Sequence, residues 1–182
     1  ILIDDSDSMA LKDQADGIGT DPRLADSLKQ LGLSDADRLS VAKGILLRNN
    51  AQLLNDLEQR YHVKVFRMGG SLRSTDGLGD NLAKQVREIK AGEDSSRLGE
   101  AIRDVLNLQR GRPTAAMIVL TDGITTAGPS IGDVSRNSRR KGIPLHIVGI
   151  GNEQSLRDVR VSDLLVERVV FVDDLVHFDF KL

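Results

Sequence analysis

Short apolar runs of strand length alternate along this chain with longer segments of helical periodicity. Most of the runs are apolar without a break, which is typical of strands that are covered on both faces. Strands and helices that alternate in this way predict an α/β fold, with a Rossmann-like, doubly wound and mainly parallel sheet that carries helices on both faces. The expected strands comprise residues 1–3, 63–66, 115–120, 144–150 and 169–172.

The helical segments are recognised by apolar residues that stand three or four positions apart. In the longest of them, residues 38–61, Leu46 and Leu53 are among the positions expected on one buried face. Residues 22–31 form a shorter candidate that begins with a proline, which suits the first turn of a helix. The other expected helices comprise residues 80–90, 96–110 and 130–142.

The composition excludes several classes of function. Only 3% of the residues are aromatic, which argues against a surface that stacks the bases of single-stranded nucleic acid. The formal net charge of −2 offers no basic surface for a phosphate backbone, so no nucleic acid is expected as a partner. The absence of cysteine excludes disulfides and thiolate metal sites. No apolar window reaches the roughly 18 residues of a spanning helix, so we expect no direct membrane insertion by this segment.

With 182 residues the chain is long enough for one domain with a sizeable core, which we expect to occupy residues 1–174. Residues 10–37 are rich in Asp, Gly and Leu, and we interpret them as an insertion near the functional site, either a lid or a plain surface insertion. Residues 175–182 alternate between apolar and polar, so they are expected to begin a following segment or to form an edge strand. Because Ile1 stands in mid-strand, we interpret the chain as a piece of a longer protein.

A polar cluster follows the first apolar run at its carboxyl end. Asp4, Ser6 and Ser8 form the pattern D-x-S-x-S, and alternate residues of an extended segment project to the same side. One carboxylate and two hydroxyls suit a hard cation such as Mg²⁺, which prefers few carboxylates and retained water. A bound cation would also offset the repulsion among the neighbouring carboxylates. An ordinary turn, in which Asp and Ser are also common, is the alternative from this motif alone.

Two further motifs follow the first one along the chain. After "DDSDSM" come "SSRLGEAI" at residues 95–102 and "MIVLTDG" at residues 117–123. Together the three motifs, in this order, resemble those of the von Willebrand factor A domain family, and "IPLHIVGIG" is similar to the strand that follows in that family. The resemblance covers residues 1 to about 151. It implies the Rossmann-like fold of that family and a metal-ion-dependent adhesion site.

Carried over by position, the metal ligands that the resemblance implies are Asp4, Ser6, Ser8, Ser96 and Asp122. The implied cofactor is Mg²⁺, or Mn²⁺ or Ca²⁺ in its place. Ser96 departs from the family pattern, which has threonine at this position, and Ser95 could take its role. Serine keeps the hydroxyl but lacks the methyl group that stiffens the χ1 rotamer of threonine.

The resemblance also implies how such a site works. In this family the cation typically lacks one protein ligand, and an acidic side chain of a protein partner completes its shell. This implies a divalent-metal-dependent protein-binding module for adhesion or assembly rather than an enzyme. The sequence further resembles domains of large bacterial membrane-anchored proteins, which implies an extracytoplasmic domain on the periplasmic side.

A shift of the frame by one residue gives Asp5-x-Asp7, which resembles the nucleophile motif of haloacid dehalogenase-like phosphatases. In this phosphohydrolase hypothesis Asp5 attacks a phosphoryl group and Asp7 is the acid and base. Against it, Met9 stands where that family carries Thr or Val, and "SSRLGEAI" has no role. The hypothesis further requires Thr121 as a hydroxyl that contacts the phosphate and Lys141 as a residue that neutralises charge. Asp173 and Asp174 would hold Mg²⁺.

The histidines offer no recognisable ligand pattern, because His62, His146 and His177 are far apart in the sequence. His146 lies within an apolar run, so we interpret it as a core residue with satisfied hydrogen bonds. The sequence also contains no Ser/His/Asp signature and no phosphate-binding glycine loop.

Overall fold

The computed structural model describes residues 1–13, 22–33, 36–74, 82–152, 162–165 and 179–181. The chain divides into two compact units, Ile1–Asn152 and Glu153–Leu182. All five of the predicted metal ligands belong to the first unit.

The strands of the first unit are β1 (Leu2–Ile3), β2 (Phe66–Gly69), β3 (Ser71–Ser74), β4 (Met117–Thr121) and β5 (Leu145–Gly149). They form one sheet in the order β3-β2-β1-β4-β5. β1 pairs in parallel with both β2 and β4, and β5 pairs in parallel with β4. The prediction of a Rossmann-like, mainly parallel sheet is therefore confirmed.

The β2–β3 hairpin differs from the sequence prediction in two ways. β3 was not predicted, because "SLRS" lacks a continuous apolar run and is partly exposed; it pairs antiparallel with β2 through a turn at Gly70, whose φ of 58° favours glycine. The strand expected over residues 63–66 begins only at Phe66, because its partner β1 begins pairing at Leu2.

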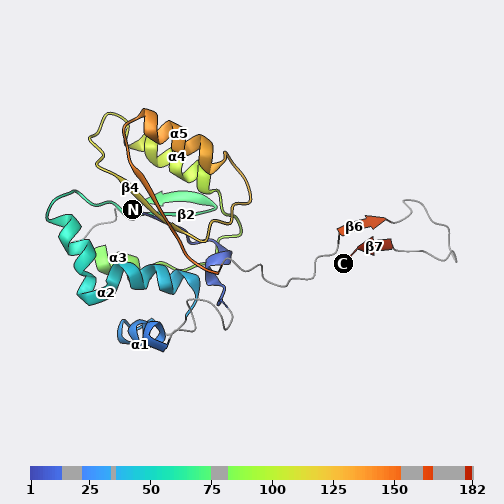
Figure 1. Cartoon of the computed structure of the whole chain (residues 1–182), viewed down its shortest axis with the longest axis horizontal. Coiled ribbons are helices and arrows are strands. Elements are labelled where there is room, and N and C mark those ends of the chain that lie inside the picture. Colours follow the sequence, from blue (N-terminus) through green and yellow to red (C-terminus); the bar gives the residue numbers. More distant parts are fainter. Residues whose placement is uncertain (14–21, 34–35, 75–81, 153–161, 166–178, 182) are drawn as a thin grey trace. The chain divides into compact units, whose positions relative to one another are not determined.

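The helices cover both faces of the sheet, as predicted. The buried side chains of α1, α2 and α3 belong to one core, and those of α4 and α5 to a second core on the other face. Figure 1 shows α2 and α3 on one side of the strands β2 and β4, and α4 and α5 on the other. The helices are α1 (Pro22–Gln30), α2 (Arg38–Glu58), α3 (Leu82–Glu88), α4 (Leu98–Leu108) and α5 (Ile131–Arg140), with a short 3₁₀ helix η1 (Asp7–Ala10) after β1.

The central strands supply side chains to both cores. Leu2 packs with residues of α4 and α5, whereas Ile3 packs with residues of α2 and α3. Val119 and Leu120 of β4 divide between the two cores in the same way. Neighbouring residues of a strand point to opposite faces, so a sheet with two covered faces needs strands that are apolar without a break.

Part of the predicted insertion, residues 10–37, packs against α2. Leu28 of α1 is buried, and it approaches α2 so closely that a Cβ at Gly44 would lie 2.8 Å from Leu28 Cδ2. The residues 14–21 and 34–35 of the predicted insertion lie outside the described residues.

The buried face predicted for α2 is wrong in its second half. Leu46 is buried as expected, but Leu53 is 43% exposed and Leu54 is buried in its place. The cause is a kink, since residues 48–51 have non-helical backbone angles inside α2. Four non-helical residues shift the phase of a pattern that repeats every 3.6 residues, so the apolar positions after the kink face another direction.

The interpretation of His146 as a core residue is also wrong, because its side chain is exposed. β5 is paired along only one edge within the described part of the chain, and its residue Ile147 is likewise 42% exposed. An apolar run predicts a strand, but only the order of strands decides which of them lies at the edge.

In the second unit, β6 (Ser162–Leu165) pairs antiparallel with β7 (Asp179–Lys181), so β7 falls within the predicted following segment, residues 175–182. The strand expected over residues 169–172 and the domain end expected at residue 174 lie outside the described residues. Among the helices described, none has both the length and the apolar character required to cross a membrane.

Candidate functional site

The ends of β1 and β4 lie side by side at the carboxyl edge of the sheet, because these strands are parallel neighbours with Ile3 opposite Leu120. The pairing continues one step further, since the backbone N of Asp4 donates to Leu120 O at 2.9 Å. The hydroxyl of Thr121, the last residue of β4, donates to Asp4 Oδ2 at 2.7 Å. Both side chains are buried, so the topology fixes Asp4 at the base of a polar cluster.

Ser6 and Ser8 continue this cluster. Ser6 donates to Asp4 Oδ1 through its hydroxyl at 2.6 Å and through its backbone N at 3.1 Å. Ser6 Oγ and Ser8 Oγ are 3.1 Å apart. The structure therefore brings the three residues of the D-x-S-x-S motif together, but not as one extended segment: Ser6 is extended, whereas Ser8 lies in η1.

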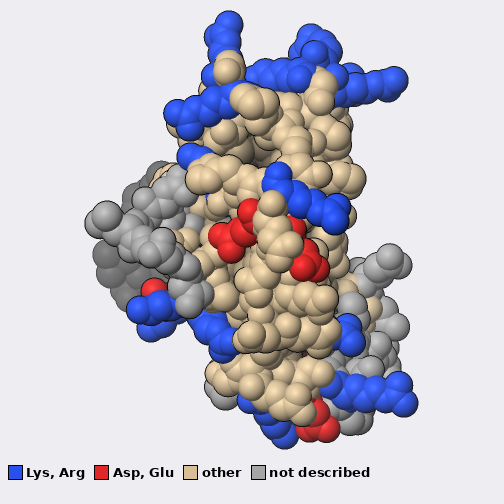
Figure 2. All heavy atoms as spheres, turned by 90° about the vertical axis from the view of Figure 1, so that its left-hand side faces the viewer, with Lys and Arg blue, Asp and Glu red and all other residues tan. Residues whose placement is uncertain are grey.

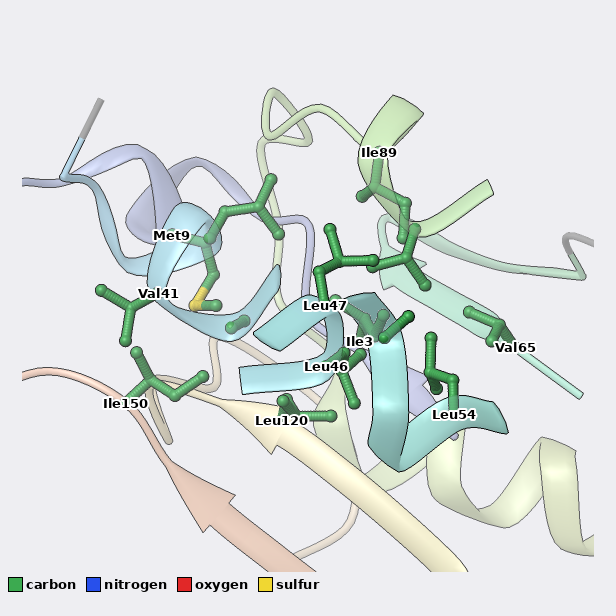
Figure 3. Packing of buried hydrophobic residues seen from close by; sticks show 14 of the residues in the cluster. Ile3, Met9, Val41, Leu46, Leu47, Leu54, Val65, Ile89, Leu120 and Ile150 are labelled. Atoms are coloured by element: carbon green, nitrogen blue, oxygen red, sulfur yellow. The ribbon is translucent and has the colours of Figure 1, made fainter. Parts of the chain in front are cut away.

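Met9 anchors the polar cluster in the core. Its side chain is fully buried and lies with Val41 of α2 and Ile150 in the core on this face of the sheet (Figure 3). Burial of a side chain of this size contributes about 1.5–3 kcal/mol relative to an exposed one. Because Ser8 and Met9 are adjacent in η1, the burial of Met9 holds the serine hydroxyl near Ser6.

Asp122 follows β4 directly, and both of its carboxylate oxygens have partners. Oδ1 accepts a hydrogen bond from Ile124 N at 2.9 Å, and Oδ2 accepts one from Arg38 Nη1 at 3.0 Å. The same guanidinium donates to Asp13 Oδ1 from Nε at 3.1 Å and from Nη2 at 2.7 Å. Arg38 therefore connects the segment before α1 with the loop after β4.

Ser96 lies in the loop before α4 and is buried, with 2% of its surface exposed. Its backbone is joined to the loop after Asp122, because Thr126 N donates to Ser96 O at 2.8 Å and Ser96 N donates to Thr126 Oγ1 at 3.2 Å. The Ser96 hydroxyl has no hydrogen-bond partner within the described residues. A buried polar atom without a partner typically costs about 1–3 kcal/mol, so this oxygen is available to a ligand.

The cluster is electrostatically unfavourable for its own carboxylates. Burial raises the pKa of Asp4 above its ordinary value, and the nearby charge of Asp122 acts in the same direction. Hydrogen bonds from Ser6 and Thr121 oppose this rise in the Asp4 pKa. A positive charge beside Asp4 would therefore stabilise its ionised form.

Asp5 has different surroundings from Asp4, although the two residues are adjacent. Its carboxylate is buried and lies 3.8 Å from Arg67 of β2, measured from Oδ2 to Nη1. Burial raises the pKa of Asp5, and the charges of Arg67 and Arg73 oppose this rise. Arg73 is also paired with Glu93. Asp5 is thus part of a charge cluster on the β2–β3 side of the sheet.

The structure places Lys141 away from Asp5, although the phosphatase hypothesis requires both residues at one site. Lys141 donates to Leu106 O at 3.1 Å and to Asn107 Oδ1 at 3.2 Å, at the end of α4 and just before the start of β5. Because β5 runs parallel to β4 and β1, its start lies at the edge opposite to Asp5. Figure 2 shows one face of the molecule, from which many Lys and Arg side chains project outward. Asp173 and Asp174 lie outside the described residues.

Arg38 and Asp13 were not predicted from the sequence as members of the site. One signal was present, because an arginine in the first turn of a helix opposes the helix dipole and needs another reason to be there. Asp13 offered no local signal, since it stands in a segment rich in Asp and Gly. Their meeting depends on how α2 is packed beside the loop after β4.

The donors at this edge have the chemistry that a hard divalent cation prefers, namely carboxylate and hydroxyl oxygens. They include the buried carboxylate of Asp4, the hydroxyls of Ser6 and Ser8, and the unpartnered hydroxyl of Ser96. No group of three or more His, Asp or Glu side chains suited to a metal occurs in the described part of the chain. Any cation here would therefore depend on neutral hydroxyls as well as on carboxylates.

Comparison with known families decides the classification. The model of the von Willebrand factor type A domain matches residues 52–174, more than half of the chain. The chain belongs to this family. The match includes Ser96 and Asp122 but begins after the first motif. A search of the curated proteins finds no match.

Two solved structures to which this chain is similar are described as membrane proteins. An aerotolerance-related membrane protein from Bacteroides fragilis, carrying multiple mutations to serines, has a TM-score of 0.54 and 16% identity, over 98% of this chain and 79% of that one. An uncharacterized membrane spanning protein from Vibrio fischeri has a TM-score of 0.40 and 17% identity, over 99% of this chain and 76% of that one. At 16% identity, the first similarity supports the von Willebrand factor type A fold alone.

Membership of the family has a general functional meaning. Von Willebrand factor type A domains are typically interaction modules without enzymatic activity, and they commonly bind a divalent metal. This von Willebrand factor type A domain is accordingly a protein-interaction module of a general kind.

Proposed function

We propose that this von Willebrand factor type A domain binds a protein partner through a divalent cation, most suitably Mg²⁺. The observation that carries the proposal is the cluster that the buried Asp4 and Ser6 form with the half-buried Ser8, beside Thr121 at the carboxyl edge of the sheet. Asp4, Ser6, Ser8, Ser96 and Asp122 would hold the cation, directly or through water.

The charge of the site supports a divalent ion. When ionised, Asp4, Asp13 and Asp122 carry three negative charges, and Arg38 carries one positive charge, which leaves the four groups at −2. These side chains are largely buried, so the repulsion between them is only weakly screened. A divalent cation would balance this charge. It would also offset the effect of burial, which raises the pKa of Asp4.

The partner that we propose offers an Asp or Glu carboxylate. A cation held partly by neutral serine hydroxyls retains positive charge, which attracts an anionic oxygen into a position that the protein leaves to water. We further propose an extracytoplasmic site for the domain, within a bacterial membrane-anchored protein. The description of a similar fold in a membrane protein from Bacteroides fragilis supports this location.

Ser96→Ala is expected to weaken Mg²⁺ binding by about 10-fold to 100-fold, in the range found when groups around a metal are removed. The stability of the metal-free protein should not fall, because the lost hydroxyl has no partner within the described residues. Calorimetric titration of Mg²⁺ and Mn²⁺, with thermal unfolding of the metal-free protein, measures both effects.

Ser95→Ala is the matched control, since it removes the neighbouring hydroxyl, and it should leave metal affinity unchanged. If Ser95→Ala weakens binding and Ser96→Ala does not, Ser95 is the ligand in this loop. If the wild-type domain binds neither metal, the proposed function is wrong. Release of phosphate from p-nitrophenyl phosphate that is lost in Asp5→Asn would instead support the phosphatase hypothesis.

A further inference from the structure

Arg38 is a buried cation in direct contact with a proposed metal ligand. Only 6% of its surface is exposed, and its guanidinium is held between Asp13 and Asp122. Gly151 closes the site from a third side, because a Cβ there would lie 3.0 Å from Arg38 Nε. A fixed positive charge therefore stands beside the position at which Asp122 would meet a metal ion.

The contacts of Arg38 with the two carboxylates are unequal. Nε and Nη2 both donate to Asp13 Oδ1, whereas a single donor, Nη1, reaches Asp122 Oδ2. Loss of the Asp122 contact would leave the guanidinium with two hydrogen bonds and an opposite charge at Asp13. The partial release of Asp122 is therefore less costly than the exposure of an unpaired buried arginine would be.

We propose that Arg38 is a resident cation of this site, which neutralises Asp122 in the metal-free protein. When a divalent ion binds, Arg38 gives up Asp122 and stays paired with Asp13 alone, a change that we call the transfer to Asp13. This inference rests on the proposed function. Arg38 is a positioning residue and no metal ligand, because a guanidinium carries donors only. It makes the metal-free site stable and lowers its affinity for the metal, since the ion must compete with a charge that is already present.

The test compares Arg38→Gln with Lys43→Gln. Lys43 is the matched control, because it is a second buried cation on α2, and it donates to the backbone carbonyls of Arg87 and Ile89 instead of a site carboxylate. Arg38→Gln is expected to tighten Mn²⁺ binding by about tenfold, since the competing charge is gone. Lys43→Gln should leave the affinity unchanged. Electron paramagnetic resonance counts free Mn²⁺, and calorimetry with Mg²⁺ provides a second measurement.

The transfer to Asp13 is tested by Asp13→Asn, alone and combined with Arg38→Gln. Asp13→Asn should weaken Mn²⁺ binding, because the guanidinium then loses its second carboxylate and holds Asp122 more firmly. In the Arg38→Gln background the same change should have a smaller effect. Equal effects in both backgrounds would show that Asp13 acts only through its charge, and the transfer would be wrong.

The outcomes separate this inference from the proposed function. If the wild-type domain binds Mn²⁺ and Arg38→Gln binds it equally or more weakly, the inference is overturned and the metal site stands. If neither protein binds Mn²⁺, the proposed function is wrong, and the role of Arg38 as a competitor is wrong with it. Should Arg38→Gln not fold, an Asp13→Asn affinity equal to that of the wild type overturns the transfer.

Discussion

Asp4→Asn is expected to abolish divalent cation binding, with an affinity loss of about 100-fold or more, since even outer partners of a metal contribute about 10-fold to 100-fold. Asp4 is the carboxylate on which the cluster is built, because Ser6 and Thr121 both donate to it. Asparagine has nearly the same shape, and its amide can still accept from Ser6. Calorimetric titration of Mg²⁺ into the variant and the wild-type domain measures the loss.

Asp5→Asn is the matched control for this experiment. It removes the same charge from the adjacent buried residue, whose carboxylate lies toward Arg67 rather than Thr121. Some loss of affinity through the change in charge is expected, but less than about tenfold, because the charge acts from a greater distance. If Asp5→Asn abolishes binding and Asp4→Asn does not, the assignment of the motif is off by one residue.

Asp4→Asn is also expected to change how the stability of the metal-free protein depends on pH. Burial raises the folded-state pKa of Asp4 above its ordinary value of 3.8, so between these two values the folded state binds more protons than the unfolded state. The contribution of Asp4 to the stability of the wild type should therefore rise as the pH falls through this window, and it should be smallest at neutral pH. Asp4→Asn lacks this titration. Its gain in thermal stability over the wild type should be largest at neutral pH and should shrink toward acid pH.

Gly99→Ala is expected to destabilise the domain by about 3 kcal/mol, at the upper end of the cost of overpacking. A Cβ at Gly99 in the first turn of α4 would lie 1.9 Å from the backbone O of Pro129. A backbone oxygen cannot rotate away as a flexible side chain can, so α4 or the loop before α5 must move. For a domain of this size the fall in melting temperature should be about 6–12 °C, measured by circular dichroism.

Gly132→Ala is the control for this prediction, because Gly132 is the second residue of α5 just as Gly99 is the second residue of α4. The nearest atom to a Cβ at Gly132 would be Ser130 Oγ at 3.7 Å, which is an ordinary contact. Alanine favours a helix over glycine by up to about 1 kcal/mol, so this variant should be slightly more stable. If both variants are stabilised, the close approach of Pro129 to α4 does not occur in solution.

The stability of α4 matters for the site, because Ser96 and Gly99 belong to the same motif. The loop that carries Ser96 is joined to Thr126, and the contact of Gly99 with Pro129 lies a few residues further along the same connection. Gly99→Ala should therefore also weaken metal binding, as the position of Ser96 depends on this contact. Leu98 and Ile102 on the same helix secure it in the second core.

The amino-acid sequence by itself determined the kind of fold and the grouping of the first motif. Unbroken apolar runs that alternate with helices require a sheet with two covered faces, and such patterns are local properties of the chain. Asp4, Ser6 and Ser8 meet because they are close in sequence. The buried Met9 also holds η1, the short helix that contains Ser8, against the core. That these three residues bind a metal together with Ser96 and Asp122 remains a prediction.

Only the tertiary structure decided what depends on residues far apart in the chain. Arg38 reaches Asp122, which is 84 positions away, because α2 packs beside the loop after β4. The exposure of His146 follows from the position of β5 in the sheet, and that of Leu53 follows from the kink in α2. Periodicity records which side chains are apolar, whereas burial and charge pairing depend on which elements come to lie next to one another.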